Sequence, residues 1–253
     1  MNTITKKYLV ITFFVSWLLW GSVAIAGNAG IEFISFGSPL GTILYVLGGV
    51  SPAICEILLK KSNSSKEEFQ SFVKSIVNPK HSIWMYVYAI GGALVIQSIP
   101  VFFGLSQVRQ SLYIGFLMII PMIIGGGIEE IGWRGLLQPE LEKKYPHIVA
   151  AVSVGIIWAI WHLPLWFIDG THQQTMNFMW FCMNTIMLSF FIGSVTYVSK
   201  SIFMAVLAHA SINAFWEVME PTNQILPSLL LMIFVIIVTM MIDYIVSKKE
   251  KIE

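Results

Sequence analysis

The chain is 253 residues long; 56% of its residues are hydrophobic and only 11% are charged. A soluble domain carries about 25% charged residues, so this composition excludes an ordinary soluble protein and indicates a polytopic membrane protein. The formal net charge of +1 gives no reason to expect nucleic acid as a partner.

Apolar runs of about 20 residues can cross roughly 30 Å of hydrocarbon as helices, and about eight such runs are present. They lie near residues 8–26, 40–59, 83–104, 112–138, 147–168, 176–198, 201–219 and 225–246. We predict an all-α fold, in which residues 1–253 form a single integral membrane domain of about eight transmembrane helices. The first run follows two lysines and ends in "AIAG", as a secretory signal does, but its length favours an uncleaved first span.

The placement of lysine and arginine predicts the orientation, because short loops rich in these residues stay in the cytoplasm. With a cytoplasmic N-terminus, only Arg109 falls in an outer loop, and the outer segments otherwise hold Glu32, Asp169, Glu217 and Glu220. The inner residues are Lys6, Lys7, Lys60, Lys61, Lys66, Lys74, Lys80, Lys143, Lys144, Lys200, Lys248, Lys249 and Lys251. We therefore expect a multi-pass protein of the cell membrane with both termini in the cytoplasm.

The inner loop after the second run has an amphipathic pattern. Phe69, Phe72, Val73 and Ile76 follow i, i+3, i+4, i+7 spacing, with lysine and glutamate on the other face. This pattern predicts a short helix near residues 66–77 that lies in the membrane interface, a solvated connector being the alternative.

The fourth run contains "PMIIGGGIEEIGWRGLLQPE", residues 121–140, with three charged groups at membrane depth. Each such group costs about 2.5–3.5 kcal/mol at the bilayer centre, so it faces another polar group or a wet cavity. Glu130 and Arg134 have the i, i+4 spacing and the acid-first order of a favourable ion pair. Glu129 points about 100° away and is left without a local cation. The glycines at 125–127 weaken the helix and let another backbone or a substrate come close.

Two later runs carry imidazoles. His162 lies just before Pro164, which we expect to kink or end its helix, and His209 is i, i+4 from Asn213. A carboxylate and an imidazole can remove a proton from a shared water, and a second imidazole and an amide can donate hydrogen bonds to an oxyanion. Glu129, His162 and His209 also form a His₂Glu set, which would suit a catalytic zinc with one open position.

These residues allow other interpretations. Intramembrane histidine and asparagine form interhelical hydrogen bonds, and proton-coupled transport also places carboxylates and histidines at depth. A non-enzymatic membrane partner, in bacteriocin immunity or sensor regulation, would use the same fold without turnover. The chain contains neither HExxH nor GxSxG, which argues against the soluble zinc-protease and serine-hydrolase templates.

Three motifs on separate predicted spans resemble the signature motifs of the CPBP (Abi) family, which comprises type II CAAX prenyl endopeptidases and bacteriocin-processing or immunity proteins. The motifs are Glu129-Glu130-x-x-x-Arg134, an aromatic residue four positions before His162, and His209-x-x-x-Asn213. Their order matches the family, and the resemblance is strongest over a motif-bearing core of about 112–219. The family's usual phenylalanine before the second histidine is Trp158 here, so the pocket differs locally.

The resemblance implies an integral membrane endopeptidase whose substrate is a peptide or protein, membrane-anchored or lipidated in one branch. Glu129 would be the general base with His162, whereas His209 and Asn213 would form the oxyanion hole. Family members are called metalloproteases. If zinc were bound through Glu129, then Glu130 would be the base, and a metal-free mechanism stays open.

The remaining motif residues, Glu130, Arg134 and Trp158, would shape the site by the same resemblance. A rise of 1.5 Å per residue puts Glu129 and His209 about 12–14 Å inside the cytoplasmic face. His162 would lie about 22 Å deep if its helix began at residue 147, so we expect a later start, after an interfacial segment around "LEKKYPHIV". The predicted site is a cavity that opens to the cytoplasm and cleaves a peptide bond near that face.

Overall fold

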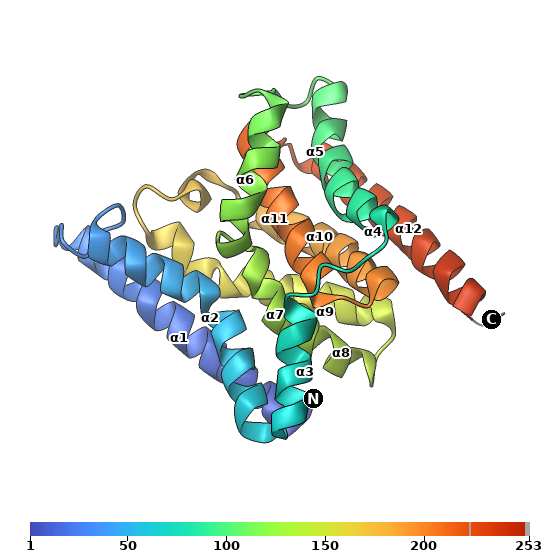
Figure 1. The fold of residues 1–253 in the computed structure, drawn as a ribbon. Coiled ribbons are helices and arrows are strands. Elements are labelled where there is room, and N and C mark those ends of the chain that lie inside the picture. Colours follow the sequence, from blue (N-terminus) through green and yellow to red (C-terminus); the bar gives the residue numbers. More distant parts are fainter. Residues whose placement is uncertain (223, 251–253) are drawn as a thin grey trace.

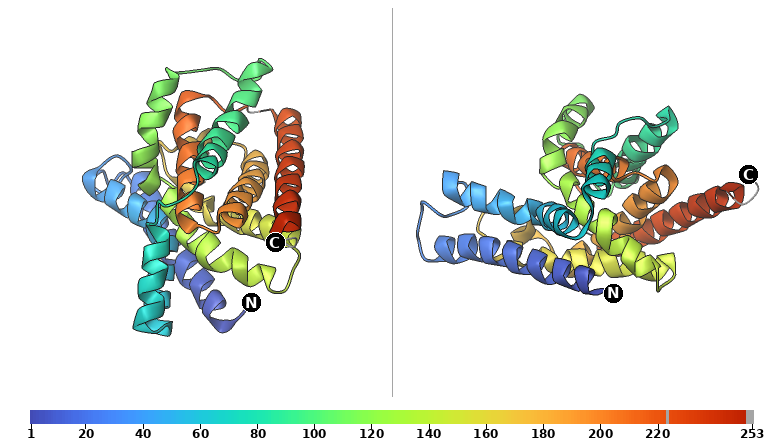
Figure 2. Two further views of the ribbon diagram at one scale, coloured as in Figure 1. Left: turned by 45° about the vertical axis from the view of Figure 1, so that its right-hand side comes forward. Right: turned by 60° about the horizontal axis from the view of Figure 1, so that its bottom comes forward.

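The structure, a computed structural model, describes residues 1–222 and 224–250. Every regular element within these residues is a helix, apart from an isolated antiparallel bridge between Val108 and Met219. Figure 1 shows the helices assembled in one bundle, and Figure 2 gives two further views of it. The predicted all-α fold is confirmed.

Six helical segments of the described residues are long and apolar enough to cross a membrane. They are α1 (Thr3–Asn28), α2 (Pro39–Asn63), the run of α4 (Ile83–Tyr86), η1 (Val87–Gly91) and α5 (Gly92–Phe102), the run of α9 (His147–Trp161) and η4 (Leu163–Phe167), α10 (Phe178–Ser199) and α12 (Ile225–Glu250). A bent pair over 112–142 is a seventh candidate, and α11 (Ile202–Val218), with 17 residues, is a shorter apolar helix. These segments coincide with the predicted runs, so the multi-pass helical bundle is confirmed.

The fourth predicted span is not one regular helix. It consists of α6 (Leu112–Ile124), η2 (Gly127–Glu129), α7 (Glu130–Gly132), η3 (Trp133–Leu137) and α8 (Gln138–Glu142), with a bend of 44° between α6 and the rest. The break falls at Gly126, whose φ of 143° is accessible only to glycine. The next residue, Gly127, lies against α11, where an added Cβ would be 2.7 Å from the Val206 carbonyl oxygen. The glycines therefore redirect the chain as well as allow close packing.

The start of α9 corrects a prediction. The helix begins at His147, directly after its N-cap Pro146, and not after a longer interfacial segment. Proline fixes φ and has no N–H to satisfy, so it suits the start of a helix. The other end agrees with the sequence: the α-helix stops at Trp161, His162 is its C-cap, and Pro164 continues in the 3₁₀ turn η4.

The amphipathic helix is present as α3 (Lys66–Ile76). A capping box closes its N-terminus: the Ser65 side chain accepts from the Glu68 N–H, and the Glu68 carboxylate accepts from the Ser65 N–H. Phe72 and Ile76 pack against a small apolar cluster that includes Val206 of α11. The predicted helix near 66–77 is therefore confirmed, and its place in the membrane interface stays a prediction.

The centre of the bundle is formed by α10 and α11. Helix α11 packs against α6, α5 and α10, and α10 packs against α9 and α12. Buried residues make up 67% of the most apolar stretch of α10 but only 22% of that of α12. Helix α12 therefore presents most of its apolar side chains outward, as expected for contact with lipid.

Contacts between loops define two opposite ends of the bundle. At one end, which we call the lysine-rich end, the start of α1, helix α3, the loop 143–146, the loop 200–201 and the end of α12 carry the inner lysines; Asn2 there donates to Glu140 at 2.8 Å. At the other end, Arg109 pairs with Glu220, and Phe36 lies beside Gly170. In Figure 1 the loop between α5 and α6 is at the top, whereas α3, α8 and the N-terminus are at the bottom. Lys251 lies outside the described residues.

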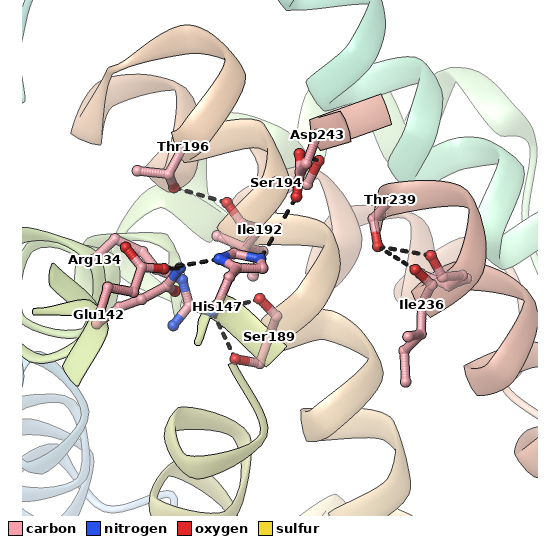
Figure 3. A network of polar contacts seen from close by, with 12 residues as sticks. Arg134, Glu142, His147, Ser189, Ile192, Ser194, Thr196, Ile236, Thr239 and Asp243 are labelled. Carbon is pink, nitrogen blue, oxygen red and sulfur yellow. Dashed lines mark hydrogen bonds and ion pairs between the residues drawn. The ribbon is translucent and has the colours of Figure 1, made fainter. Parts of the chain in front are cut away.

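A partly exposed polar network joins four helices near the lysine-rich end (Figure 3). His147 Nδ1 lies 2.8 Å from Glu142 Oε1, and its Nε2 lies 3.5 Å from Asp243 Oδ2. Ser194 of α10 donates to Asp243 at 2.5 Å, and Gln138 donates to Glu142 at 2.7 Å. These contacts link α8, α9, α10 and α12 to one another.

Candidate active site

A cavity of about 520 Å³ lies between α1, α2, α6, α9, α10 and α11. The residues of the three sequence motifs that line it are Glu129, Trp158, His162, His209 and Asn213. The fold thus brings together side chains that the sequence places on three separate spans. Glu130 and Arg134 are not part of the lining and lie behind it, buried.

Glu129 sits at the end of η2, immediately after the glycine break, and only 6% of its surface is exposed. The Trp158 indole N–H donates to its Oε2 at 2.8 Å. This donor is neutral, so the hydrogen bond orients the carboxylate without neutralising it. Because phenylalanine has no N–H, the tryptophan at this position does more than alter the pocket shape.

Glu130 joins two of the three motifs. Its Oε2 lies 3.3 Å from Arg134 Nε, which is the ion pair expected from the i, i+4 spacing. Its Oε1 lies 2.8 Å from His209 Nδ1 on α11. An ionised carboxylate only accepts hydrogen bonds, so His209 Nδ1 carries the proton in this contact and Nε2 is directed elsewhere. Sequence reasoning missed this link, because no periodicity relates residues that are 79 positions apart.

His162 is oriented by its own helix. Its Nδ1 lies 2.8 Å from the Trp158 carbonyl oxygen, which can only accept, so Nδ1 carries the hydrogen and Nε2 of the neutral ring is free to take a proton. The Trp158 ring contacts both imidazoles, with centroid distances of 5.7 Å to His162 and 5.0 Å to His209. Trp158 is therefore the common neighbour of Glu129 and both histidines.

Asn213 and His209 meet at the glycine break. Asn213 Nδ2 donates to the Gly125 carbonyl oxygen at 3.0 Å, and the amide group has a second N–H. A Cβ at Gly126 would collide with Asn213 Nδ2 and would lie 3.1 Å from His209 Nε2. The backbone at Gly126 thus approaches both side chains as closely as glycine allows, in agreement with the predicted role of the three glycines.

Residues outside the three sequence motifs also line the cavity. Arg109, His172, Gln173 and Glu217 line it at the end opposite the lysines, and Arg109 and His172 are exposed. The opening of the cavity to the cytoplasm stays a prediction. Sequence reasoning missed these rim residues, although Arg109 stood out as the lone cation of the outer loops.

The arrangement does not fit a three-ligand zinc site. Within residues 1–222 and 224–250, no group of three or more His, Cys, Asp and Glu side chains is placed to hold a metal ion. Trp158 lies against both histidine rings and donates to Glu129, so these three side chains do not converge on one point. A zinc ion bound by Glu129, His162 and His209 stays a prediction, and no step below depends on it.

Two comparisons bear on the function. Residues 111–215 match the family described as "Type II CAAX prenyl endopeptidase Rce1-like". Over 237 residues the chain is 26% identical to the CAAX prenyl protease 2 of Methanococcus maripaludis, and the match covers 86% of each protein. The matched family region contains all three motifs. The predicted resemblance is confirmed, and with it the class of membrane protease.

Proposed function

The chain is a multi-pass membrane endopeptidase related to the type II CAAX prenyl endopeptidases, and we propose that it hydrolyses a peptide bond with water activated by Glu129 and His162. One observation carries the proposal: Glu129, His162, His209 and Asn213 come from three different spans and line one cavity. Such groups at membrane depth are costly and functional by default.

The first step uses the two proton acceptors of the cavity. The Glu129 carboxylate takes a proton from the water, and His162 Nε2 accepts the second hydrogen bond and orients the water. The water oxygen then forms a bond to the peptide carbonyl carbon. When the C–N bond breaks, the proton held by Glu129 passes to the leaving nitrogen, so that Glu129 acts first as base and then as acid.

The second pair stabilises the oxyanion. The free N–H of Asn213 and Nε2 of His209 both face the backbone at Gly126, next to Glu129 in the chain. Because Glu130 holds Nδ1, a charged His209 ring donates through Nε2 to the oxyanion. Loss of one donor of this kind lowers kcat by roughly 10²–10³-fold.

The cavity walls suit an apolar peptide. They include Trp20, Val46, Leu165, Met176 and Phe181, and the volume of about 520 Å³ is in the range of ligand sites. The Methanococcus maripaludis relative is named a CAAX prenyl protease. For this chain we propose a membrane-anchored or lipidated peptide or protein of the cell membrane as substrate, because its apolar part can stay in lipid while the scissile bond enters the cavity.

The proposal is tested with Glu129→Gln, which keeps the shape of the side chain and its hydrogen bond from Trp158. Membrane proteomes of a deletion strain, complemented with wild type or with the variant, identify the cleaved proteins; the variant should restore no cleavage. Its thermal unfolding in detergent should match the wild type, and Glu67→Gln on the exposed face of α3 serves as a control with full activity. Full cleavage by Glu129→Gln would rule the mechanism out.

A further inference from the structure

We propose that Tyr45 of α2 is a further catalytic residue, whose hydroxyl binds the N–H of the scissile peptide and holds the leaving nitrogen beside Glu129. The statement rests on the proposed function, in which Glu129 first takes a proton from water and later gives it to that nitrogen. Tyr45 belongs to none of the three sequence motifs, and its helix carries none of them.

The Tyr45 side chain reaches the catalytic cavity from the α2 side. It lines the cavity together with Glu129 and His162, and it is the tyrosine of that lining. Glu129 is the charged group that acts on the Tyr45 hydroxyl. Because such an interaction weakens with distance, the hydroxyl lies on the side of the cavity where Glu129 works.

The Tyr45 hydroxyl is available to a ligand. Among the described residues it has no hydrogen-bond partner, whereas the hydroxyl of Tyr88 lies 2.7 Å from that of Ser194. The Tyr45 hydroxyl is also not sealed in the packed core, as the Tyr8 hydroxyl is. A phenol is protonated at neutral pH and both donates and accepts hydrogen bonds, so a hydroxyl in this place can bind a peptide N–H.

Packing fixes the Tyr45 ring before a substrate arrives. Phe36 and Trp20 lie against it, with centroid distances of 4.9 and 6.3 Å. The Trp20 indole N–H donates to the Tyr45 carbonyl oxygen at 2.9 Å, and the Trp20 ring is stacked on His162 at 6.1 Å. Gly48 leaves room for Trp20, because a Cβ there would collide with the indole. Trp20 therefore sets the position of Tyr45 relative to His162, and a preorganised side chain loses little entropy on binding.

Tyrosine in an apolar span has a common structural role, which is to lie at the interface between lipid and water. Tyr113 and Tyr244 fit that role, since they are 63% and 66% exposed. Tyr45 is half-buried and lines the cavity. This difference separates Tyr45 from the interfacial tyrosines and assigns its hydroxyl to the contents of the cavity.

The leaving nitrogen is the part of the scissile peptide that the four motif residues leave without a partner. His209 and Asn213 hold the oxyanion, and Glu129 and His162 hold the water. While the carbonyl carbon is tetrahedral, Tyr45 accepts the N–H and so orients the lone pair of the nitrogen toward the protonated Glu129. The C–N bond then breaks, its electron pair stays on nitrogen, and the proton of Glu129 completes the amine. Tyr45 gains and loses no proton.

The test is Tyr45→Phe, which removes the hydroxyl and keeps the ring. The substrate is a synthetic peptide that spans the cleavage site of a protein left uncleaved in the deletion strain. The kcat should fall roughly tenfold while KM stays nearly unchanged, because the contact forms when the nitrogen becomes tetrahedral. Thermal unfolding in detergent should match the wild type, since the hydroxyl has no partner among the described residues.

The matched control is Tyr88→Phe, which removes a hydroxyl that contacts Ser194 and does not line the cavity. This variant should unfold at a lower temperature and keep its kcat, which is the opposite of the result for Tyr45→Phe. Full activity of Tyr45→Phe, or a lower kcat together with an equally lowered unfolding temperature, would overturn the proposal.

An ester analogue of the same peptide, with oxygen in place of the scissile N–H, tests the contact itself. Wild type and Tyr45→Phe should cleave the ester at similar rates, because the ester offers no N–H to the hydroxyl. An equal loss on amide and ester would show that the hydroxyl acts elsewhere and would overturn the assignment. Failure of the proposed function appears differently, as cleavage of the amide that survives Glu129→Gln.

Discussion

Trp158 determines the local geometry of the site. It donates to Glu129 at 2.8 Å, its carbonyl oxygen accepts from His162, and its ring packs on His209. A single residue thus orients the base and contacts both imidazoles. A phenylalanine at this position would supply the packing and the carbonyl but not the indole N–H.

We expect Trp158→Phe to lower kcat while leaving KM nearly unchanged. A hydrogen bond to a charged group contributes about 1.5–3 kcal/mol, so the loss is roughly 10- to 150-fold if the bond orients the base in the transition state. The measurement is steady-state cleavage of an identified substrate. Full activity of Trp158→Phe would contradict the role of the indole N–H in orienting Glu129.

Glu130 positions His209 and also stabilises the fold, because it is the counter-charge of Arg134. It is 0% exposed and lies between Arg134 and His209, so its removal leaves a buried guanidinium without its counter-charge. We expect Glu130→Gln to destabilise the protein by about 3–5 kcal/mol, the typical effect of breaking a buried pair. Thermal unfolding in detergent measures it, with the exposed Glu67→Gln as control. Equal stability of the two variants would refute the buried pair.

At the scale of elements, the bent span 112–142 decides whether the motifs can meet. Helix α6 ends before the glycines, and the chain resumes as short 3₁₀, α and π segments that turn Glu129 toward the cavity and Glu130 toward α11. A straight helix would keep the i, i+4 pair but would not bring Gly126 against His209 and Asn213.

This geometry predicts that Gly126→Ala is far more harmful than Gly125→Ala. At Gly126 an alanine meets a φ of 143° and collides with Asn213; at Gly125 the nearest atom is the flexible Met122 sulfur at 3.0 Å. Backbone strain alone costs about 1–3 kcal/mol. We expect loss of both stability and cleavage for Gly126→Ala and a mild effect for its neighbour, measured by unfolding and turnover. Similar behaviour of the two variants would argue against the break.

At the scale of the whole molecule, the first span is part of the folded protein. The Trp161 indole of α9 donates to Ser16 of α1 at 2.6 Å, and Ser16 also donates to the Gly48 carbonyl oxygen of α2 at 3.0 Å. Trp20 of α1 lines the cavity. Helix α1 therefore completes the site wall, which fits an uncleaved first span better than a removed signal.

The purified protein also allows a metal test. Because the donor groups of Glu129, His162 and His209 do not converge, we expect cleavage to survive a strong zinc chelator and metal analysis to find less than one zinc per chain. The control is a zinc protease assayed in the same detergent. Inactivation by the chelator, reversed by added zinc, would instead require these side chains to rearrange around a metal.

The sequence by itself determined the features that depend only on residues close together along the chain. Span positions follow from the length of hydrocarbon that a helix must cross, α3 from its periodicity, and the Glu130–Arg134 pair from its i, i+4 spacing. The motif residues were recognisable because charged or imidazole groups are rare in apolar runs. These signals need only neighbours along the chain.

Only the tertiary structure decided how the motifs act together. The Glu129–Trp158 and Glu130–His209 contacts join residues 29 and 79 positions apart, where no periodicity applies. Likewise, Tyr8 of α1 packs edge to face against Trp133 of the bent span, with 5.9 Å between the ring centroids. Packing between distant segments determined which side chains share one cavity, because such contacts are a property of the assembled chain and not of the order in which the residues occur.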